Sequence, residues 1–414
     1  MVAVARLPET LGLAALSAWL YLLLGRGRFW DAGPRLPDDP PPRRWPRVAV
    51  VVPARNEAAV LPDTLSSLLG QDYPGDWHVF LVDDASEDGT DQVARAVAAA
   101  AGGAERLTIV AGSPTPAGWS GKVWAMAQGT EAAAAFRPEF VLFTDADIVH
   151  PPDGLRRLVA LAEARVLDLA SVMVLLRTEG FWERLLMPAF VYFFAKLYPF
   201  RWAADPRRST AGAAGGCMLV RLGALRRAGG LEAIANAIID DCSLAAAVKG
   251  TGGRLWLGLS RQWQSVRGYA GLAGIGRMVA RSAYAQLRYS PLLLAGTVAG
   301  MSLAYLVPPA LAVWGVRRRR PAPALLGLVS WGIMTATYMP MLRWYRLSLL
   351  WAPLLPLAAF FYTLFTIDSA RRWHAGRGPE WRGRAVGRQE PVSSPVASAY
   401  SRGEGRQAHP SERE

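Results

Sequence analysis

Four uncharged, largely apolar stretches flank a central segment with a different pattern. Thr10–Gly25 has 16 residues, Tyr289–Val316 has 28, Pro321–Leu342 has 22 and Leu347–Ile367 has 21. A membrane-spanning helix needs about 20 such residues, so the last three predict spanning helices within residues 289–370. The first stretch is short for a span. We interpret it as an uncleaved anchor within residues 1–28, because arginines follow it where a cleavage site would need small residues; a signal peptide is the alternative.

Clusters of arginine beside these stretches bear on how the chain crosses the membrane. Arg26 and Arg28 predict that the segment after the first helix lies in the cytoplasm. Two further clusters are Arg317–Arg320 and a set near the C-terminus: Arg371, Arg372, Arg377, Arg382 and Arg384. A turn near Pro308–Pro309 would keep all three clusters inside, but 28 residues at about 1.5 Å each are too short for two crossings. The pattern leaves three or four spans open.

The central segment, residues 45–282, alternates short β-branched runs with helical periodicity. The predicted strands are Arg47–Pro53, Val79–Asp83, Leu107–Ala111 and Val141–Thr144, and the predicted helices between them include Asn56–Leu69 and Thr90–Ala101. Strands separated by helices of this length indicate βαβ units with right-handed crossovers, and hence an α/β fold with a parallel sheet.

Composition narrows the class of protein further. Hydrophobic residues make up 52% and charged residues 19% of the 414 positions, too apolar for a disordered chain and unusual for a wholly soluble one. The net charge of +13 would suit nucleic acid, but the arginines flank apolar runs and form no single face, which favours a lipid bilayer and no nucleic acid. The two cysteines exclude a disulfide scaffold and a Cys-rich zinc module. The tail, residues 371–414, is predicted to be disordered.

Polar residues collect where the predicted strands end. Pro53-Ala-Arg55-Asn-Glu57 follows the first strand, Asp83-Asp84 the second and Asp145-Ala-Asp147 the fourth, while a loop carries Trp119-Ser-Gly-Lys122-Val-Trp-Ala125. One acidic pair alone would indicate a helix cap. Four charged clusters in one orderly series indicate a ligand site, because ligands bind at the carboxyl ends of the strands in such sheets.

These motifs resemble the family 2 glycosyltransferases, inverting enzymes with the GT-A fold. The resemblance rests on Val-Val-Pro-Ala-Arg-Asn-Glu at 51–57, Val-Asp-Asp-Ala-Ser-Glu-Asp-Gly-Thr at 82–90 and Asp-Ala-Asp at 145–147. Gly-Lys-Val-Trp-Ala at 121–125 is similar to the ceramide glucosyltransferase-like and hopene-associated branches, the latter over most of the chain. The resemblance implies a Rossmann-like GT-A domain with membrane helices at both ends and a nucleotide-sugar donor.

Asp145 and Asp147 are the candidate metal ligands, and Asp145 also belongs to the predicted donor site. The two flank one residue of an extended segment, so their side chains point to the same side. Carboxylates of this kind suit Mg²⁺ or Mn²⁺, with the phosphates of the donor completing the shell. Lys122 is predicted to contact those phosphates from its loop; a solvated loop lysine is the alternative.

The resemblance assigns the remaining donor contacts. It implies that Asp83 and Asp84 contact the base or ribose and that Pro53, Arg55 and Glu57 line the same pocket. Which of the two aspartates faces the nucleotide stays open, because neighbouring side chains at a strand end point opposite ways.

The resemblance also places a general base at the start of a helix after a glycine-rich acceptor loop. Gly212–Cys217 fits the loop, and Asp241 matches the base, with Asp240 where glutamate is common; a helix N-cap is the alternative for either aspartate. Processive members carry Gln-x-x-Arg-Trp, of which Gln286-Leu-Arg288-Tyr289 is an incomplete version. Arg288 is predicted at the diphosphate, with Arg277 and Arg281 as competitors and membrane-flanking roles as the alternative for all three.

The acceptor is predicted from an aromatic-rich segment, residues 181–200, whose uncharged centre is too short to span a membrane. We interpret it as an interfacial helix beside the active site, with a buried core helix as the alternative. The sequence therefore predicts transfer of a sugar, UDP-linked, to a membrane lipid hydroxyl in hopanoid or related polyisoprenoid lipid synthesis at the bacterial inner membrane. The rivals are a processive polysaccharide synthase and a non-catalytic scaffold; a Rossmann oxidoreductase is disfavoured because no Gly-x-Gly-x-x-Gly follows the first strand.

Overall fold

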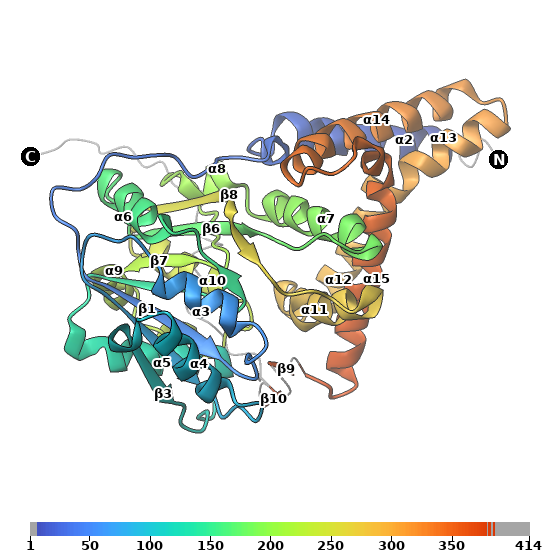
Figure 1. Cartoon of the computed structure of the whole chain (residues 1–414). Coiled ribbons are helices and arrows are strands. Elements are labelled where there is room, and N and C mark those ends of the chain that lie inside the picture. Colours follow the sequence, from blue (N-terminus) through green and yellow to red (C-terminus); the bar gives the residue numbers. More distant parts are fainter. Residues whose placement is uncertain (1–5, 379, 382–383, 386–414) are drawn as a thin grey trace, which may run out of the picture.

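The computed structural model describes residues 6–378, 380–381 and 384–385, and it divides into an α/β part and a helical part (Figure 1). The predicted tail lies outside the described residues from position 386 onward. One mixed sheet organises the α/β part, with the strand order β3-β2-β1-β4-β7-β6-β8-β5. Its strands are β1 (Val48–Ala54), β2 (Trp77–Asp83), β3 (Leu107–Ala111), β4 (Phe140–Phe143), β5 (Ile148–Val149), β6 (Leu169–Leu175), β7 (Met218–Arg221) and β8 (Leu255–Ser265).

The first four strands confirm the predicted parallel sheet, with ends that differ by one or two residues. β1 pairs in parallel with both β2 and β4, and β2 pairs in parallel with β3. β7 is antiparallel to both β4 and β6, which makes the sheet mixed where the sequence indicated a parallel one. β6, β7 and β8 were not among the predicted strands.

Each face of the sheet packs against helices because alternate residues of β1 point to opposite sides. Val48, Val50 and Val52 join one buried cluster with α3 (Leu61–Leu69), α4 (Thr90–Ala100) and α6 (Gly154–Ala164). Ala49 and Val51 join another with α5 (Gly121–Ala132), α9 (Leu222–Arg227) and α10 (Asp240–Gly250). All seven residues of β1 are buried, as expected for a strand covered on both faces.

Two predicted segments differ from the structure near the ligand-binding edge. α3 begins at Leu61 and not at Asn56, because Asn56 has a left-handed backbone (φ 52°) and its side-chain oxygen accepts a hydrogen bond from the Glu87 amide at 2.9 Å. The predicted loop around Lys122 is also wrong in part. α5 begins at Gly121 after the N-cap Ser120, so Lys122 lies in the first turn of a helix.

A third buried cluster joins the α/β part to the helical part. It is built from α7 (Phe181–Leu197), α11 (Gly271–Gln286) and α15 (Leu355–His374). Ten of the residues of α7 are buried, while Phe181 and Leu197 near its ends are exposed. α7 coincides with the segment interpreted as interfacial, and its burial favours the alternative, a core helix.

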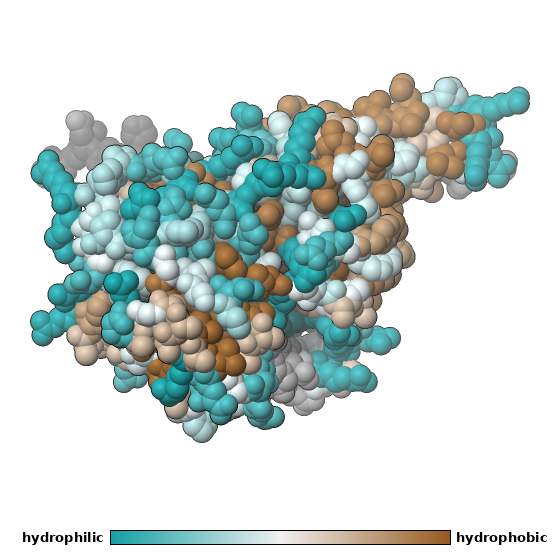
Figure 2. Space-filling view, viewed as in Figure 1, coloured by the Kyte–Doolittle hydropathy of each residue, from teal (hydrophilic) through white to brown (hydrophobic). Residues whose placement is uncertain are grey.

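Among the described residues, four helices are long and apolar enough to cross a membrane: α2 (Leu7–Leu24), Pro291–Arg317, α14 (Pro321–Trp344) and Leu349–His374. The second comprises α12 (Pro291–Met301), a π-helical turn (Ser302–Leu306) and α13 (Val307–Arg317), so the chain makes no turn near Pro308–Pro309. Both prolines closely follow the π-helical turn, and local π-helical adjustments of this kind accommodate proline within a membrane helix. α2, α13 and α14 project together from the molecule, and apolar residues cover this surface (Figures 1 and 2).

Candidate active site

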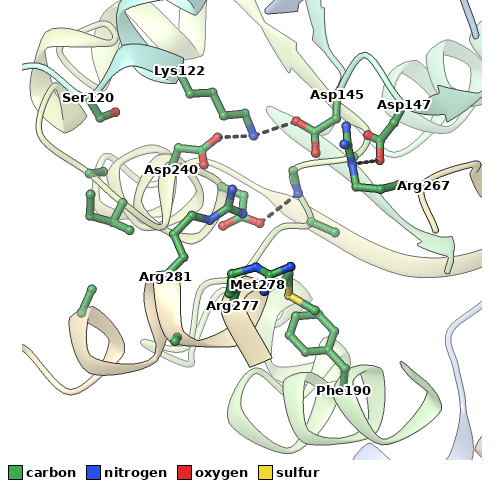
Figure 3. A pocket seen from close by; sticks show the side chains of 18 of the residues that line it. Ser120, Lys122, Asp145, Asp147, Phe190, Asp240, Arg267, Arg277, Met278 and Arg281 are labelled. Atoms are coloured by element: carbon green, nitrogen blue, oxygen red, sulfur yellow. Dashed lines mark hydrogen bonds and ion pairs between the residues drawn. The ribbon is translucent and has the colours of Figure 1, made fainter. Parts of the chain in front are cut away.

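A cavity of about 720 Å³ lies at the carboxyl edge of the sheet, where α11 and α7 face it (Figure 3). Its sheet side is polar: Glu57, Lys122, Asp145, Asp147, Asp240, Asp241 and Arg267. Its opposite side combines aromatic and apolar residues, Phe190, Phe194, Met278, Tyr284, Tyr289 and Trp373, with the arginines Arg277, Arg281, Arg372 and Arg377. The cavity therefore joins a highly charged wall to one that suits an apolar ligand.

Lys122 links two of the carboxylates in this wall. Its Nζ lies 2.8 Å from Asp145 Oδ1 and 3.0 Å from Asp240 Oδ2 (Figure 3). Burial alone would lower the pKa of Lys122, but the two carboxylates raise it above its usual value. Burial would raise the pKa of Asp145, and the ammonium group of Lys122 reverses this and lowers it. Lys122 is therefore charged and Asp145 ionised at neutral pH.

Arg267 makes a second bridge, which sequence reasoning missed. Its Nε lies 2.8 Å from Asp147 Oδ2, and its Nη2 lies 2.9 Å from Glu57 Oε1. Ser265 also donates a hydrogen bond to Asp147 Oδ2 at 3.0 Å. The sequence analysis expected ligand-binding residues directly after the ends of strands (the strand-end rule). Arg267 follows β8 by two residues, so this rule would have selected it if β8 had been predicted.

Asp241 occupies the second position of α10 and faces the glycine-rich loop. Its Oδ2 accepts a hydrogen bond from the Gly215 amide at 2.9 Å, and its Oδ1 accepts one from the Cys242 amide at 2.7 Å. Burial and the negative charge of Asp240 raise the pKa of Asp241 to about 6, although Lys122 acts in the opposite direction. Ile239 is the N-cap of α10, so the capping alternative is wrong for both aspartates.

The Asp83-Asp84 pair separates into two different environments. Asp84 is buried beside Arg55, whose Nη1 lies 3.8 Å from its Oδ2 and also donates to its backbone oxygen. Asp83 is half-buried, and its Oδ1 accepts a hydrogen bond from the Ser86 amide at 3.1 Å. Asp84 and Arg55 therefore hold the loop after β2. Pro53 and Glu57 line the cavity, whereas Arg55, Asp83 and Asp84 do not.

The structure does not bring Arg288 to the cavity. It is exposed and lies past the end of α11, with a left-handed backbone (φ 51°). Its predicted competitors, Arg277 and Arg281, line the cavity from α11 and point toward the carboxylates of the opposite wall (Figure 3). In the part of the chain that the structure describes, neither forms an ion pair with a carboxylate. Arg277 and Arg281 are thus available to a bound anion.

Comparison with known proteins decides the class of this domain. Residues 49–229 match the family described as glycosyl transferase family 2. This segment, the glycosyl transferase domain, makes up less than half of the chain. This domain includes β1 to β7 and ends before α10, so it contains Lys122, Asp145 and Asp147 but not Asp241.

Two similar proteins extend this finding. The chain is similar to the beta-monoglucosyldiacylglycerol synthase of Synechocystis sp., with 32% identity over 162 residues, which cover 37% of this chain and 31% of that protein. The chain thus matches less than a third of this relative's length. Among solved structures, the mannosyltransferase PcManGT from Pyrobaculum calidifontis, in complex with GDP-Man and Mn²⁺, gives a TM-score of 0.52 at 22% identity, covering 88% of this chain and 98% of that one. This likeness confirms the predicted GT-A fold.

The carboxylates of the glycosyl transferase domain fit the predicted divalent cation as ligands. No group of three or more His, Cys, Asp or Glu residues in the described ranges is placed to hold a metal alone. Asp145 and Asp147 supply two carboxylates at one cavity. Mg²⁺ is commonly held by one or two carboxylates together with substrate phosphates and water. A two-carboxylate site that is completed by a donor diphosphate therefore matches these residues.

Proposed function

We propose that this protein transfers a sugar from a nucleotide-sugar donor, such as a UDP-sugar, to the hydroxyl group of a membrane lipid, with inversion at the anomeric carbon. The observation that carries the proposal is the composition of one cavity. Asp145 and Asp147, from the segment after β4, meet Asp241 of α10 there, opposite an aromatic wall next to helices that are apolar enough to span a membrane. A charged donor and an apolar acceptor would each find a matching side.

The sheet side would bind the donor. Asp145 and Asp147 would hold Mg²⁺ or Mn²⁺, which when bound neutralises charge on the departing diphosphate as a Lewis acid. Lys122, Arg277 and Arg281 would contact the phosphate oxygens. Pro53 and Glu57 would line the nucleoside pocket. Asp83 is the better candidate of its pair for the ribose or base, because Asp84 is buried against Arg55.

Asp241 would act as the general base. Its carboxylate takes the proton of the acceptor hydroxyl while the hydroxyl oxygen attacks the anomeric carbon of the sugar. The bond between that carbon and the diphosphate oxygen breaks with its electron pair on the nucleoside diphosphate. A single displacement of this kind inverts the anomeric configuration.

The acceptor is proposed to be a lipid alcohol, in the hopanoid or a related polyisoprenoid class. The aromatic wall and the name of the Synechocystis relative, a synthase of a glucosylated diacylglycerol, both support a lipid. The exposed position of Arg288 weighs against the processive polysaccharide synthase, because that function needs an arginine of this motif at the diphosphate. We propose that the catalytic domain faces the cytoplasm at a bacterial inner membrane.

An assay of the full chain in lipid nanodiscs tests this function. Labelled UDP- and GDP-sugars are supplied with Mn²⁺ or Mg²⁺ and with hopanoid alcohols, polyisoprenoid alcohols or diacylglycerol as acceptors. We expect label in the solvent-extractable lipid fraction, with inverted configuration by NMR of the product. Label only in long polymer would favour the polysaccharide synthase, and donor binding without any transfer would favour the non-catalytic scaffold.

The raised pKa of Asp241 predicts how the rate depends on pH. The base works only as a carboxylate, so below a pKa of about 6 it is protonated and kcat/KM falls about tenfold per pH unit. An aspartate with an ordinary pKa would stay ionised, and would support the reaction, down to about pH 4. Asp240→Asn removes a neighbouring negative charge, which lowers the pKa of Asp241 and shifts the acid limb to lower pH. If the acid limb of the pH–rate profile does not move in the Asp240→Asn variant, the assignment of Asp241 as the general base is contradicted.

Arg281 and Arg288 form a matched pair for testing which arginine binds the donor. Arg281→Ala removes a cavity-facing cation, so we expect the KM for the nucleotide sugar to rise by about tenfold or more. Arg288→Ala removes an exposed cation outside the cavity and should leave this KM within roughly twofold. Steady-state kinetics in nanodiscs measure both. The opposite ranking would restore the prediction made from the incomplete Gln-x-x-Arg-Trp motif.

A further inference from the structure

We propose that α15 lies flat in the bilayer surface on the side of the catalytic domain and does not cross the membrane. The chain then crosses three times, through α2, through the continuous helix Pro291–Arg317 and through α14. The proposal concerns the path of the chain and does not depend on which sugar or lipid the cavity binds.

α15 starts beside the α/β part. The preceding span, α14, ends at Trp344, whose ring lies 5.2 Å from the guanidinium carbon of Arg35 and 5.9 Å from that of Arg261. Arg261 belongs to β8, and Arg35 forms a bridge with Leu259 of the same strand. The chain therefore returns to the catalytic side before a short 3₁₀-helix, Leu349–Leu354, leads into α15.

α15 also ends beside the α/β part, after contacts along its whole length. Near its middle, Tyr362 donates a hydrogen bond to the Leu186 oxygen of α7 at 2.8 Å. Further on, the Ser369 hydroxyl accepts one from the Tyr284 amide of α11 at 3.1 Å. Trp373, in its last turn, lines the catalytic cavity. A crossing helix of this length would end about 30 Å from the side on which it started.

The direction of α15 agrees with these contacts. In Figure 1 it runs across the common direction of α2, α13 and α14 and passes beside α11 and α12. Since those three helices are the ones that project away from the α/β part, a helix that runs across them lies along the membrane that they would cross.

One face of α15 is apolar and is not covered by any other described part of the chain. Its exposed residues, with the 3₁₀-helix before it, follow one helical stripe: Leu350, Leu354, Leu357, Phe360, Leu364 and Ile367, exposed by 39 to 84%. The opposite face, with Ala358, Ala359 and Tyr362, is buried in the protein. The stripe is continuous with the apolar spans, and Arg371 and Arg372 at its end suit lipid headgroups. The partner of this face is therefore the bilayer.

The distribution of arginine supports the same topology. With α15 in the membrane surface, Arg26 and Arg28, then Arg343 and Arg346, and then Arg371, Arg372 and Arg377 all lie on the catalytic side, while Arg6 and Arg317–Arg320 lie opposite. With α15 as a fourth crossing, the last of these clusters would lie opposite as well. Basic residues near membrane helices favour one side, so three crossings fit better.

Cysteine labelling distinguishes the two topologies. The only native cysteines, Cys217 and Cys242, are buried. Labelling of the parent protein therefore measures the background signal. Single exposed cysteines are introduced as Glu105→Cys in the catalytic domain, Arg318→Cys, Arg343→Cys and Ala375→Cys, and intact cells are treated with a membrane-impermeant maleimide. We expect Arg343→Cys and Ala375→Cys to behave as Glu105→Cys does, and Arg318→Cys to show the opposite accessibility. Labelling of Ala375→Cys from the side opposite to Glu105→Cys would overturn the proposal.

Depth measurements test the orientation directly in purified full-length protein. Spin labels are attached at Leu357→Cys and Leu364→Cys, seven residues apart on the exposed stripe. Their collision rates with oxygen and with a nickel complex measure how deep each label lies in the nanodisc bilayer, and we expect equal, shallow depths. A crossing helix would separate them by about 10 Å. Leu325→Cys and Gly332→Cys, at the same spacing on exposed positions of α14, should show that separation. Neither experiment measures sugar transfer, so each can fail while the proposed function holds.

Discussion

Replacing Asp241 with asparagine is expected to lower the rate of sugar transfer by about 10²–10⁴-fold, the usual contribution of a general base. The amide has nearly the same shape but cannot take the proton of the acceptor hydroxyl. Donor binding should persist, because the predicted donor contacts lie on Lys122, Asp145 and Asp147. Single-turnover transfer and calorimetric binding of the nucleoside diphosphate measure the two effects separately.

The asparagine also changes a local hydrogen-bond pattern, which requires a control. Asp241 accepts from the amides of Gly215 and Cys242 with its two oxygens, whereas an asparagine side chain has one acceptor oxygen. A melting curve in detergent therefore accompanies the kinetics. Asp63→Asn, at an exposed position of α3, provides the same chemical change away from the cavity and should leave transfer unaltered. Full transfer by a folded Asp241→Asn variant would remove Asp241 as the base.

The strand-end rule explains why much of the site was predictable. Pro53 and Glu57 follow β1, and Asp145 and Asp147 follow β4; the register of these neighbouring parallel strands brings their carboxyl ends to one edge. The rule works from local sequence because buried β-branched runs mark such strands. It failed for Arg267, because β8 belongs to the later, mixed half of the sheet, where strand order depends on tertiary pairing.

The arginine assignment failed for a different physical reason. Residues 277 and 281 are four apart on one helix and share a face, which α11 turns toward the cavity. Arg288, seven residues after Arg281, would share that face if the helix continued, but α11 ends at Gln286. Ser290-Pro291 follows closely, and the residue before a proline is disfavoured in a helix. The motif predicted that an arginine binds the diphosphate, but the position at which α11 ends determines which arginine reaches the cavity.

Hydropathy likewise identified the membrane helices but not their directions. Leu349–His374 is as apolar as the three proposed spans, and its hydropathy alone would make it a fourth. What distinguishes it is a set of contacts far apart in sequence, such as Tyr362 with Leu186 and Ser369 with Tyr284. Length and composition determine whether a helix can cross a bilayer, and tertiary packing determines whether it does.

Asp145→Asn is the second variant with a large expected effect, on the cation that supports transfer. Loss of one of two carboxylate ligands should raise the Mn²⁺ concentration for half-maximal rate by at least about tenfold, since even residues behind the ligands contribute 10–100-fold to metal affinity. Titration of the rate with Mn²⁺, together with the electron paramagnetic resonance signal of bound Mn²⁺ in the presence of nucleoside diphosphate, measures this. Asp63→Asn is again the matched control.

The ion pair between Asp145 and Lys122 provides the sharpest alternative explanation for such a loss. If Asp145 only held Lys122 in place, through the 2.8 Å contact, then Lys122→Met would reproduce the defect and the double variant would add nothing to it. A ligand role predicts the reverse. Lys122→Met should weaken donor binding while Mn²⁺ binding is retained, because removing a neighbouring cation leaves both carboxylates free for the metal. The contradicting outcome is an unchanged Mn²⁺ dependence in Asp145→Asn, with a loss only in donor affinity. Asp145 would then position Lys122 and would not be a ligand of the cation.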